Sequence, residues 1–265
     1  MQNYKNNQLV NDENAVISVS ALSVIGDRDE QQDSFGYSLK VNEGIVVVCD
    51  GMGGHNGGQI ASNLSTQLFI SEYDKTDEKT DICQQLLTIA RETDCRISDL
   101  KDPGGDKLNA GSTCVAVVIR EKRLYWCSVG DSRAYLLRGE EFVQLTQDHN
   151  YTTVLDEKRR AGLISEDQYN NESQRGEALI SYLGIGNLSL IDYNNMPLEL
   201  ESKDKIVIMS DGLYKLVPQT DICSIVQNFT NSSEALQALD AKAKRFAKSK
   251  SVYRDNMTVA IITIR

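Results

Sequence analysis

The sequence contains few of the residues that build soft-metal sites. Its 265 residues include two histidines and six cysteines, and no two cysteines form a C-x-x-C pair. Several cysteines lie inside apolar runs, where cysteine behaves as a small hydrophobic residue. Neither His55 nor His149 belongs to a Cys/His ligand pattern, so zinc is not indicated. Scattered free cysteines are typical of reducing compartments, and we therefore expect a cytoplasmic protein.

Long apolar segments are absent as well. No stretch approaches the ~20 apolar residues that cross a bilayer. Residues 1–8 also lack the apolar core of a signal peptide. We therefore expect no association with a membrane.

Positive charge is scarce, since the formal net charge is −10. Proteins that bind nucleic acids neutralise backbone phosphates with clustered Lys and Arg, so a nucleic-acid partner is disfavoured. The negative charge either serves solubility alone or accompanies bound cations that reverse the charge locally. An acidic protein with bound cations can act on a small anionic group.

Two motifs resemble those of other enzyme classes but are incomplete. The glycine-rich segment 51–58 lacks G-x-G-x-x-G, and Gln59-Ile60 follows where a phosphate-binding loop has Lys and Ser or Thr. Segment 127–133 matches C-x5-R of tyrosine phosphatases, whose thiolate loop leads into a helix N-terminus. Here a strand is predicted to follow, and Asp131 would oppose a thiolate. We therefore reject both assignments.

The composition is that of a globular protein, with 40% hydrophobic and 25% charged residues. Its length suits one domain, which we place at residues 1–265. Short runs rich in Val and Ile predict strands at 45–49, 113–119, 124–129, 134–137, 206–209 and 258–264. Two polar connections, at 120–123 and 139–140, predict hairpins, so the middle of the chain is expected to be antiparallel.

Apolar residues spaced three or four apart predict helices. They occur at 60–68, at 82–90 with Thr80 or Asp81 as the cap, from about 218, and at 232–248. The buried face of the first helix is predicted to carry Ile60, Leu64 and Leu68. Because strands and helices do not alternate strictly, we predict an α+β fold with helices covering antiparallel sheets, not a doubly wound parallel sheet.

Residues 148–195 differ from the rest of the chain in being polar. A helix-like piece runs through 155–163, and Ser165 opens a second capping pattern. We interpret the segment as an inserted flap.

Four aspartates stand beside small residues or asparagine at the ends of apolar runs. They are found in the pairs Asp50-Gly51, Asp131-Ser132, Asp211-Gly212 and Asp255-Asn256. Each pair alone is an ordinary turn former. Together, at one edge of a sheet, four carboxylates repel one another unless cations bind between them. Hard oxygen ligands suit Mg²⁺ or Mn²⁺, and adjacent glycines let backbone carbonyls approach an ion.

Arg28 lies in another polar segment, 26–33, among acidic and amide side chains. Taken alone, Arg28 is best explained as a surface residue that pairs with Asp29. In a metal site, however, a guanidinium group is the natural partner of two phosphate oxygens.

Six motifs in succession resemble those of the PP2C-type (PPM) phosphatases, and of their bacterial branch in particular. They are Arg28-x-x-Gln31-Gln32-Asp33, Asp50-Gly51-Met52-Gly53-Gly54-His55, Gly111-Ser112-Thr113, Gly130-Asp131-Ser132-Arg133, Ser210-Asp211-Gly212 and Asp255-Asn256. The resemblance spans residues from about 20 to 265. It implies a central antiparallel β-sandwich with helices on both faces. It also implies metal-dependent hydrolysis of phosphoserine and phosphothreonine in proteins, by a water activated between two divalent ions, Mn²⁺ or Mg²⁺.

The resemblance further implies a set of ion ligands. Asp50 would bridge both ions, Asp211 and Asp255 would bind the first, and the Gly51 carbonyl would bind the second. Many bacterial members bind a third ion, whose ligands would be Asp131 and Asp211.

Two further residues would act at the reaction itself, since Arg28 would hold the phosphate and Asp33 a metal-bound water. Met52 departs from the animal and plant pattern, where a histidine at this position is the proposed general acid. His55 does not inherit that role by default. Gln31 replaces the usual asparagine, a change that we expect to alter hydrogen bonding near the site more than activity.

The implied partners are phosphorylated proteins that a serine/threonine kinase also recognises. The segment 148–195 lies where bacterial relatives carry a variable flap, so we expect it to shape substrate choice. A surface decoration without that role is the alternative. We expect a monomer. The alternative function is a binding or signalling module with the same fold and weak catalysis, which would normally have lost ligands, whereas all four aspartates are present here.

Overall fold

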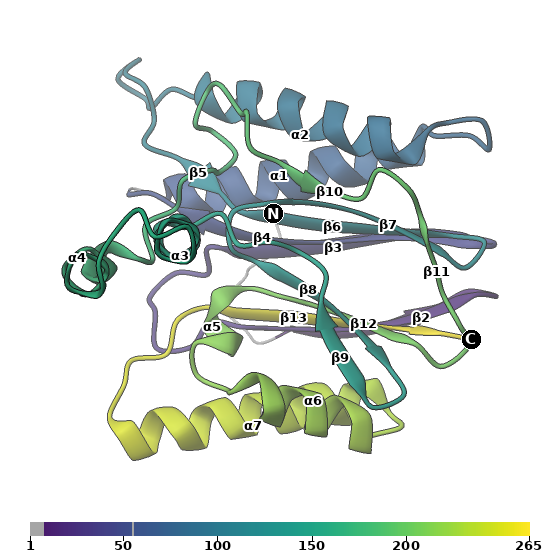
Figure 1. Ribbon diagram of the computed structural model, residues 1–265. Coiled ribbons are helices and arrows are strands. Elements are labelled where there is room, and N and C mark those ends of the chain that lie inside the picture. The colour runs from purple at the N-terminus through teal and green to yellow at the C-terminus, as the bar shows by residue number, and fades with distance from the viewer. Residues whose placement is uncertain (1–7, 55) are drawn as a thin grey trace.

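The computed structural model describes residues 8–54 and 56–265. The apolar runs form two antiparallel sheets packed face to face, with helices on both outer faces (Figure 1). The first sheet has the order β1 (Gln8–Glu13), β2 (Ile17–Val24), β13 (Met257–Ile264), β12 (Lys205–Met209), β8 (Arg133–Arg138), β9 (Glu141–Gln144). The second has the order β10 (Asp192–Tyr193), β7 (Arg123–Val129), β6 (Cys114–Arg120), β4 (Glu43–Met52), β3 (Asp33–Lys40), with β11 (Leu198–Glu199) beside β7 and β5 (Gly111–Ser112) beside β4. The predicted α+β sandwich is confirmed.

The central strands are buried on both faces because successive side chains point to opposite sides of a strand. In β4, Val46 and Val48 pack in the core between the sheets. Ile45 and Val47 pack on the other side, under the helices of the second sheet. Each such side chain contributes about 1.5–3 kcal/mol by burial. The end of β4, which carries Asp50, is therefore held firmly in place.

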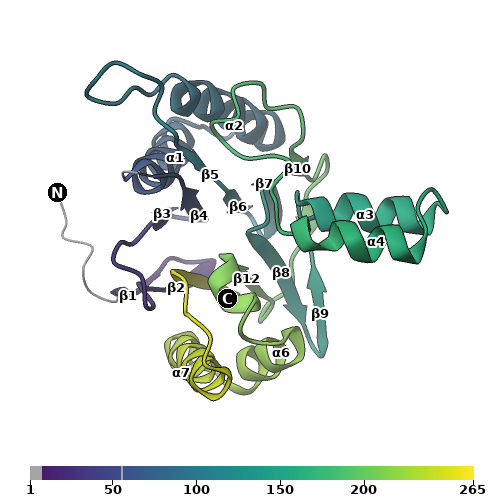
Figure 2. The same cartoon turned by 90° about the vertical axis from the view of Figure 1, so that its left-hand side faces the viewer.

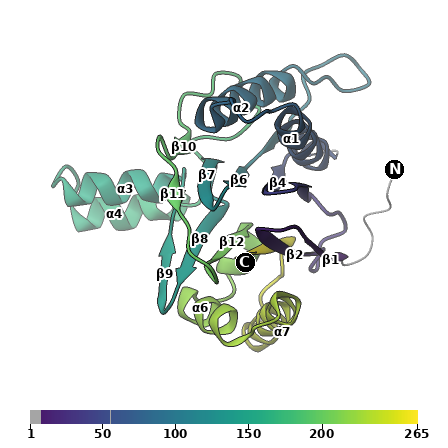
Figure 3. The same ribbon diagram turned by 90° about the vertical axis from the view of Figure 1, so that its right-hand side faces the viewer.

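Two helices cover each sheet (Figures 1 and 3). On the second sheet lie α1 (Gly57–Asp74) and α2 (Ile82–Ser98), and on the first lie α6 (Gln219–Asn228) and α7 (Ser232–Lys250). Of the two predicted caps of α2, Thr80 and Asp81, the structure uses Asp81, whose side chain accepts a hydrogen bond from Gln84 N. No helix in the described ranges is long and apolar enough to cross a membrane.

The predicted buried face of α1 is partly wrong. Leu68 is buried, but the Ile60 side chain is 42% exposed. The face against the sheet instead carries Ala61, Ser65 and Phe69, all fully buried. Small residues allow the helix to approach β4 closely. The buried face therefore lies about one residue further along the helix than the face that the large apolar residues predict.

The polar segment contains α3 (Tyr151–Arg160) and α4 (Glu166–Glu172), which project from the side of the sandwich (Figure 2). Ser165 and Gln168 form a capping box at the start of α4, as the sequence predicts. Beyond a 3-10 turn (Ser173–Arg175), the chain returns to the sandwich, where Leu183 exchanges two backbone hydrogen bonds with Ser112. Only the first half of the segment therefore projects.

Candidate active site

The aspartates singled out in the sequence come together at one edge of the sandwich. Antiparallel pairing sets Asp33, at the start of β3, opposite Asp50, near the end of β4. Asp211 opens the short helix α5 (Asp211–Tyr214) directly after β12, and Asp255 lies two residues before β13, which pairs with β12. Asp131 lies in the turn between β7 and β8. The topology thus gathers five carboxyl groups from distant parts of the chain.

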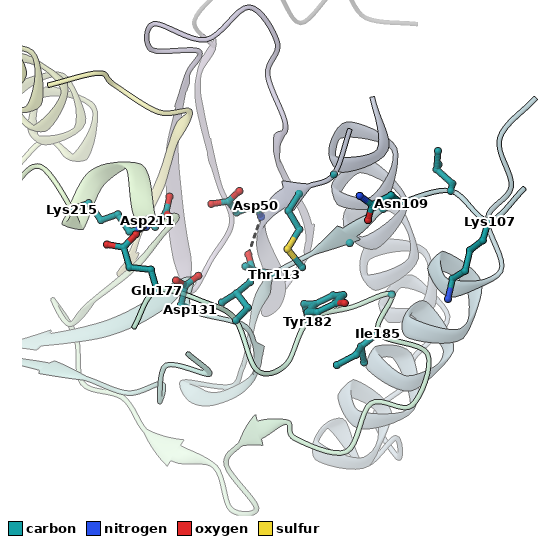
Figure 4. Close-up of a pocket in the computed structure, with 17 residues that line it drawn as sticks. Asp50, Lys107, Asn109, Thr113, Asp131, Glu177, Tyr182, Ile185, Asp211 and Lys215 are labelled. Atoms are coloured by element: carbon teal, nitrogen blue, oxygen red, sulfur yellow. Dashed lines mark hydrogen bonds and ion pairs between the residues drawn. The ribbon is translucent and has the colours of Figure 1, made fainter. Parts of the chain in front are cut away.

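Two adjoining pockets open at this edge, and both are lined by Asp50 and Asp211. The larger has a volume of about 710 Å³ and also contains Asp131 (Figure 4). The smaller has a volume of about 630 Å³ and contains the remaining predicted residues Arg28, Gly51 and Asp255. Asp33 lines neither of these pockets but a third one, beside Ser23. Its side chain is buried, and Ser210 Oγ donates to its Oδ2 at 2.7 Å.

Burial and mutual repulsion raise the pKa of three of these carboxyl groups. The pKa of Asp50 lies well above its usual value because the group is partly buried and faces Asp33, Asp211 and Asp131. Burial raises the pKa of Asp33 to about 7, against the opposing effect of hydrogen bonds from Ser210 and Thr258. The pKa of Asp131 is raised to about 6, mainly by burial and secondly by the negative charge of Asp211. The cluster therefore favours either protons or cations.

Asp50 and Gly51 lie within β4 and not in the turn that their sequence predicts, and hydroxyl groups fix the backbone there. Asp50 N donates to Thr113 Oγ1 at 2.9 Å, and Thr113 Oγ1 is hydrogen-bonded to Ser132 Oγ at 2.7 Å. Ser112 Oγ donates to the Asp50 carbonyl at 3.1 Å. The Gly111-Ser112-Thr113 motif therefore connects the end of β4, which carries Asp50, to the turn that carries Asp131.

The aspartate-glycine pairs pack so closely that only glycine fits. A Cβ atom on Gly51 would lie 2.0 Å from the Gly58 carbonyl oxygen and 2.6 Å from that of Gln32. A Cβ atom on Gly212 would lie 1.9 Å from the Asn256 carbonyl oxygen. The adjacent aspartates are thereby drawn close to the neighbouring loops.

Asn256 holds the loop that carries Arg28. Its Nδ2 donates to the carbonyls of Ile25 at 2.8 Å and Glu30 at 3.0 Å, and its Oδ1 accepts from Gln32 N at 2.8 Å. The amide of Asn256 therefore ties residues 25–32 to the start of β13.

Gln31 bonds within the same region. Its Oε1 accepts from Asp33 N at 3.1 Å and its Nε2 donates to Ser23 Oγ at 3.0 Å. The glutamine thus supports the backbone of Asp33, consistent with the expected role in hydrogen bonding near the site.

Basic side chains contact two of the aspartates. Arg28 Nη2 lies 2.6 Å from Asp255 Oδ2, and its side chain is half exposed. Lys215 Nζ lies 2.7 Å from Asp211 Oδ2 and 3.0 Å from Glu177 Oε2. The expected surface pair of Arg28 with Asp29 is therefore replaced by a pair with Asp255, across the mouth of the smaller pocket.

Lys215 and Glu177 were not identified from the sequence. A signal for Lys215 exists, because it follows Asp211 by four residues, the spacing of an ion pair on a helix. Glu177 offers no such signal, since its position depends on the return of the chain after α4.

The donor set fits hard divalent cations. Every predicted ligand is an oxygen atom, and Asp33 Oδ1 is buried without a hydrogen-bond partner. In the described ranges, no three His, Cys, Asp or Glu side chains already converge on one ion position. One oxygen of Asp211 faces Lys215 and one oxygen of Asp255 faces Arg28, so a cation that bound these oxygens would replace the two ion pairs.

The alternative motifs are explained by the fold. Burial raises the pKa of Cys127 to about 12, and the side chain is fully buried in β7. Arg133 starts a strand and pairs with Asp148, with Nη2 2.7 Å from Oδ2. Segment 127–133 is therefore no thiolate phosphate loop.

The sequence is similar to those of known bacterial phosphatases. The chain is 29% identical over 239 residues to the serine/threonine phosphatase stp of Listeria monocytogenes serotype 4b, covering 89% of this chain and 90% of that protein. It is 28% identical over 257 residues to the protein phosphatase PhpP of Streptococcus pneumoniae, covering 94% and 98%.

Solved structures show the same fold. The serine/threonine phosphatase of S. agalactiae superimposes with a TM-score of 0.80 at 26% identity, covering 94% of this chain and 100% of that chain. The catalytic domain of the serine/threonine phosphatase PstP, solved in complex with two manganese ions, has a TM-score of 0.74 at 25% identity, covering 94% and 98%.

The sequence model of one family, Protein phosphatase 2C, matches residues 23–248. That range includes Arg28 and all of the predicted aspartates except Asp255. The chain belongs to the protein phosphatase 2C family.

Proposed function

We propose that this protein hydrolyses phosphoserine and phosphothreonine esters of proteins with the help of two divalent cations, Mn²⁺ or Mg²⁺. The observation that carries the proposal is the gathering of Asp50, Asp211 and Asp255 around two adjoining pockets that also hold Arg28. Cations are needed there because the carboxyl groups are too crowded to ionise together. The PstP neighbour with two manganese ions supports the choice of metal.

The ligand set is the one that the resemblance to the family implies, and the pockets are compatible with it. Asp50 lines both pockets and would hold both ions. Asp211 and Asp255 would complete the first site, and the Gly51 carbonyl the second. Asp131, which shares the larger pocket with Asp211, would serve a third ion. When bound, the cations supply positive charge for the phosphate and acidify a water molecule.

Arg28 orients the phosphate. Its side chain is half exposed at the smaller pocket, and its guanidinium carbon lies 5.8 Å from the ring centre of Tyr253. A planar guanidinium group can donate two parallel hydrogen bonds to a phosphate. Turning from Asp255 to the phosphate would also free that aspartate to act as a ligand.

Asp33 holds the attacking water in place. Its Oδ2 is fixed by Ser210 Oγ, while its buried Oδ1 has no partner in the described structure and can accept from water. Because its pKa is about 7, the group can also take up a proton near neutral pH.

No side chain at position 52 supplies a proton to the leaving group, because Met52 has none to give. His55, which is not expected to act as the acid, lies outside the described residues. The leaving alkoxide would then take its proton from a bound water molecule. Alignment of the phosphate and stabilisation of its charge carry most of the catalysis, as is typical of phosphoryl transfer.

The cellular setting extends the proposal. The substrates are phosphoproteins. We infer that a serine/threonine kinase phosphorylates them and that the phosphatase acts on them in the cytoplasm. Residues 1–265 act as one domain and as a monomer, with 148–195 as a flap that shapes substrate choice. Nucleic acids and membranes are not expected as partners of a chain with a net charge of −10.

Hydrolysis of a phosphothreonine peptide tests the function. The purified protein is assayed with increasing Mn²⁺ or Mg²⁺, with a chelator, and as the Asp211→Asn variant. We expect phosphate release that depends on the metal and is lost in the variant. Absence of release at every metal concentration would overturn the proposal in favour of a binding module with the same fold, and unchanged release by Asp211→Asn would overturn the site.

A further inference from the structure

The larger pocket extends beyond the carboxylates. Figure 4 shows the carboxylates at one end, Tyr182 and Ile185 beyond them, and Lys107 at the far end. Its volume of about 710 Å³ is in the range that holds a drug-sized ligand, so several peptide residues can enter. The phosphate chemistry needs only the carboxylate end. The remainder of the pocket is available to other parts of a substrate.

Next to the carboxylates the wall is apolar. Met52 follows Asp50 and Gly51 at the end of β4, and both its side chain and the Tyr182 ring rest on Gly111. A Cβ atom on Gly111 would lie 2.9 Å from Met52 Cε and 2.9 Å from Tyr182 Cδ2. The glycine therefore lets the two side chains form a continuous apolar surface.

Ile185 continues this surface into the open part of the pocket. Its side chain is 40% exposed, although it lies in a segment that is otherwise anchored. An exposed isoleucine beside a half-buried tyrosine offers area that an incoming apolar side chain can cover.

The segment that carries Tyr182 and Ile185 is fixed from below. Asp94 on α2 is buried, and its Oδ1 accepts from Gly184 N at 2.8 Å and Gly186 N at 3.0 Å. Its Oδ2 accepts from Leu188 N at 3.1 Å. The surface is thus formed before a substrate arrives, which lowers the entropy cost of binding.

We propose that Met52, Tyr182 and Ile185 form a subsite for an apolar side chain that flanks the phosphorylated residue of the substrate. The inference rests on the proposed function, because the phosphorylated residue must reach the carboxylate end of the same pocket. Successive residues of an extended chain are ~3.3–3.6 Å apart, so the neighbours of that residue pass along the pocket wall. A short aliphatic or aromatic side chain matches the chemistry of the wall.

Two phosphothreonine peptides test the subsite, one with leucine and one with serine on both sides of the phosphorylated residue. We expect kcat/KM to favour the leucine peptide by about fivefold to tenfold, mainly through KM. Tyr182→Ala and Ile185→Ser should each reduce this ratio at least about threefold. The ratio compares two substrates of one protein, so changes in its overall activity cancel.

Tyr193→Ala is the matched control. This tyrosine is 39% exposed on β10 and does not line the pocket, so the variant should keep the wild-type ratio. Equal rates on the two peptides, or full retention of the ratio in both Tyr182→Ala and Ile185→Ser, would overturn the subsite alone. Failure of the wild-type protein to hydrolyse either peptide would instead overturn the proposed function and the subsite with it.

Discussion

The amino group of Lys215 lies 2.7 Å from Asp211 Oδ2, one helical turn along the chain from the aspartate that it contacts. The same group lies 3.0 Å from Glu177 Oε2, in the segment that follows α4. One ammonium group thus connects a candidate metal ligand with the segment that forms the wall of the larger pocket. An ammonium group and a divalent cation compete for the same carboxylate oxygen, so Lys215 should lower the affinity for metal.

Replacing Lys215 by methionine should tighten Mn²⁺ binding. The cation then no longer displaces an ion pair, and a positive charge near it is removed. Both effects have the same sign. Because the pair is partly exposed, we expect the Kd for Mn²⁺ to fall by about two- to fivefold, as titration calorimetry on the metal-depleted protein would show.

Lys242→Met provides the control for that change. Lys242 pairs with Asp221 between α7 and α6, with Nζ 3.0 Å from Oδ2, away from the pockets. This variant removes the same charge from the protein and should leave the Kd unchanged. An unaltered or weaker affinity in Lys215→Met would contradict the competition.

Asp50→Asn should affect the protein in two opposite ways. Partial burial and the neighbouring carboxyl groups raise the pKa of its carboxyl group, so its ionised form costs stability in the absence of metal. The variant should therefore raise the Tm of the metal-free protein by about 2–4 °C, the effect of about 1 kcal/mol in a domain of this size. It should also abolish the further rise in Tm that Mn²⁺ causes in the wild-type protein.

Arg28→Ala separates phosphate positioning from metal binding. The Tm increase with Mn²⁺ should persist, since Arg28 is no ligand, while KM for a phosphopeptide rises about tenfold or more. Scanning calorimetry and steady-state kinetics give the two readouts. If Mn²⁺ no longer raised the Tm of this variant, Arg28 would instead be needed to position the metal ligands.

The gathering of four aspartates could be predicted from the sequence because each one ends or precedes an apolar run next to a small residue or asparagine. Antiparallel pairing then brings such positions to a common edge, as it does for Asp211 after β12 and Asp255 before β13. Asp33 has no such pattern and was predicted only from the family resemblance. Tyr182 and Glu177 could not be predicted in the same way. Their positions depend on the path of the chain after α4, which is set by contacts with Asp94 and Ser112 far away in sequence.

Strands and helices were predicted correctly where their apolar patterns are distinct. Continuous runs such as those of β12 and β13 were predicted almost to their ends. Strand β3 was missed because its residues are largely polar or small and only partly buried. Strand β2 mixes serines with apolar residues, and tertiary packing buries two of its three serines, Ser20 and Ser23. Local pattern therefore failed where the other elements decide the burial.

Gly51→Ala should unfold the site locally or destabilise the whole domain. The new Cβ would meet the Gly58 carbonyl oxygen at 2.0 Å, and a backbone atom cannot move aside as a side chain can. We expect a loss of roughly 2–4 kcal/mol in the free energy of unfolding, measured by urea denaturation. Gly54→Ala in the same loop meets no atom within 4 Å and should be nearly neutral. Similar losses in both variants would contradict the steric explanation.

His149 should make the stability of the protein depend on pH. It is buried behind the Asp131 turn, where its Nδ1 accepts from Gly130 N at 3.2 Å, and burial lowers its pKa to about 4. The unfolded chain has the ordinary histidine pKa of about 6.5, so between pH 6.5 and 4 it binds a proton that the folded protein does not. Stability is therefore present above pH 6.5 and is lost as the pH falls, by about 1.4 kcal/mol per pH unit at most.

Comparison with His149→Asn isolates this effect. Asparagine can accept the hydrogen bond of Gly130 N but does not titrate. Asp33 acts with the opposite sign, because its folded pKa of about 7 is raised and it binds a proton first in the folded state. That contribution is the same in both proteins and cancels in their difference. The free energy of unfolding of the wild-type protein minus that of the variant, measured with chelator present, should be constant above pH 7 and fall between pH 6.5 and 4. A difference that stays flat down to pH 4 would mean that His149 takes up its proton equally well in the folded protein.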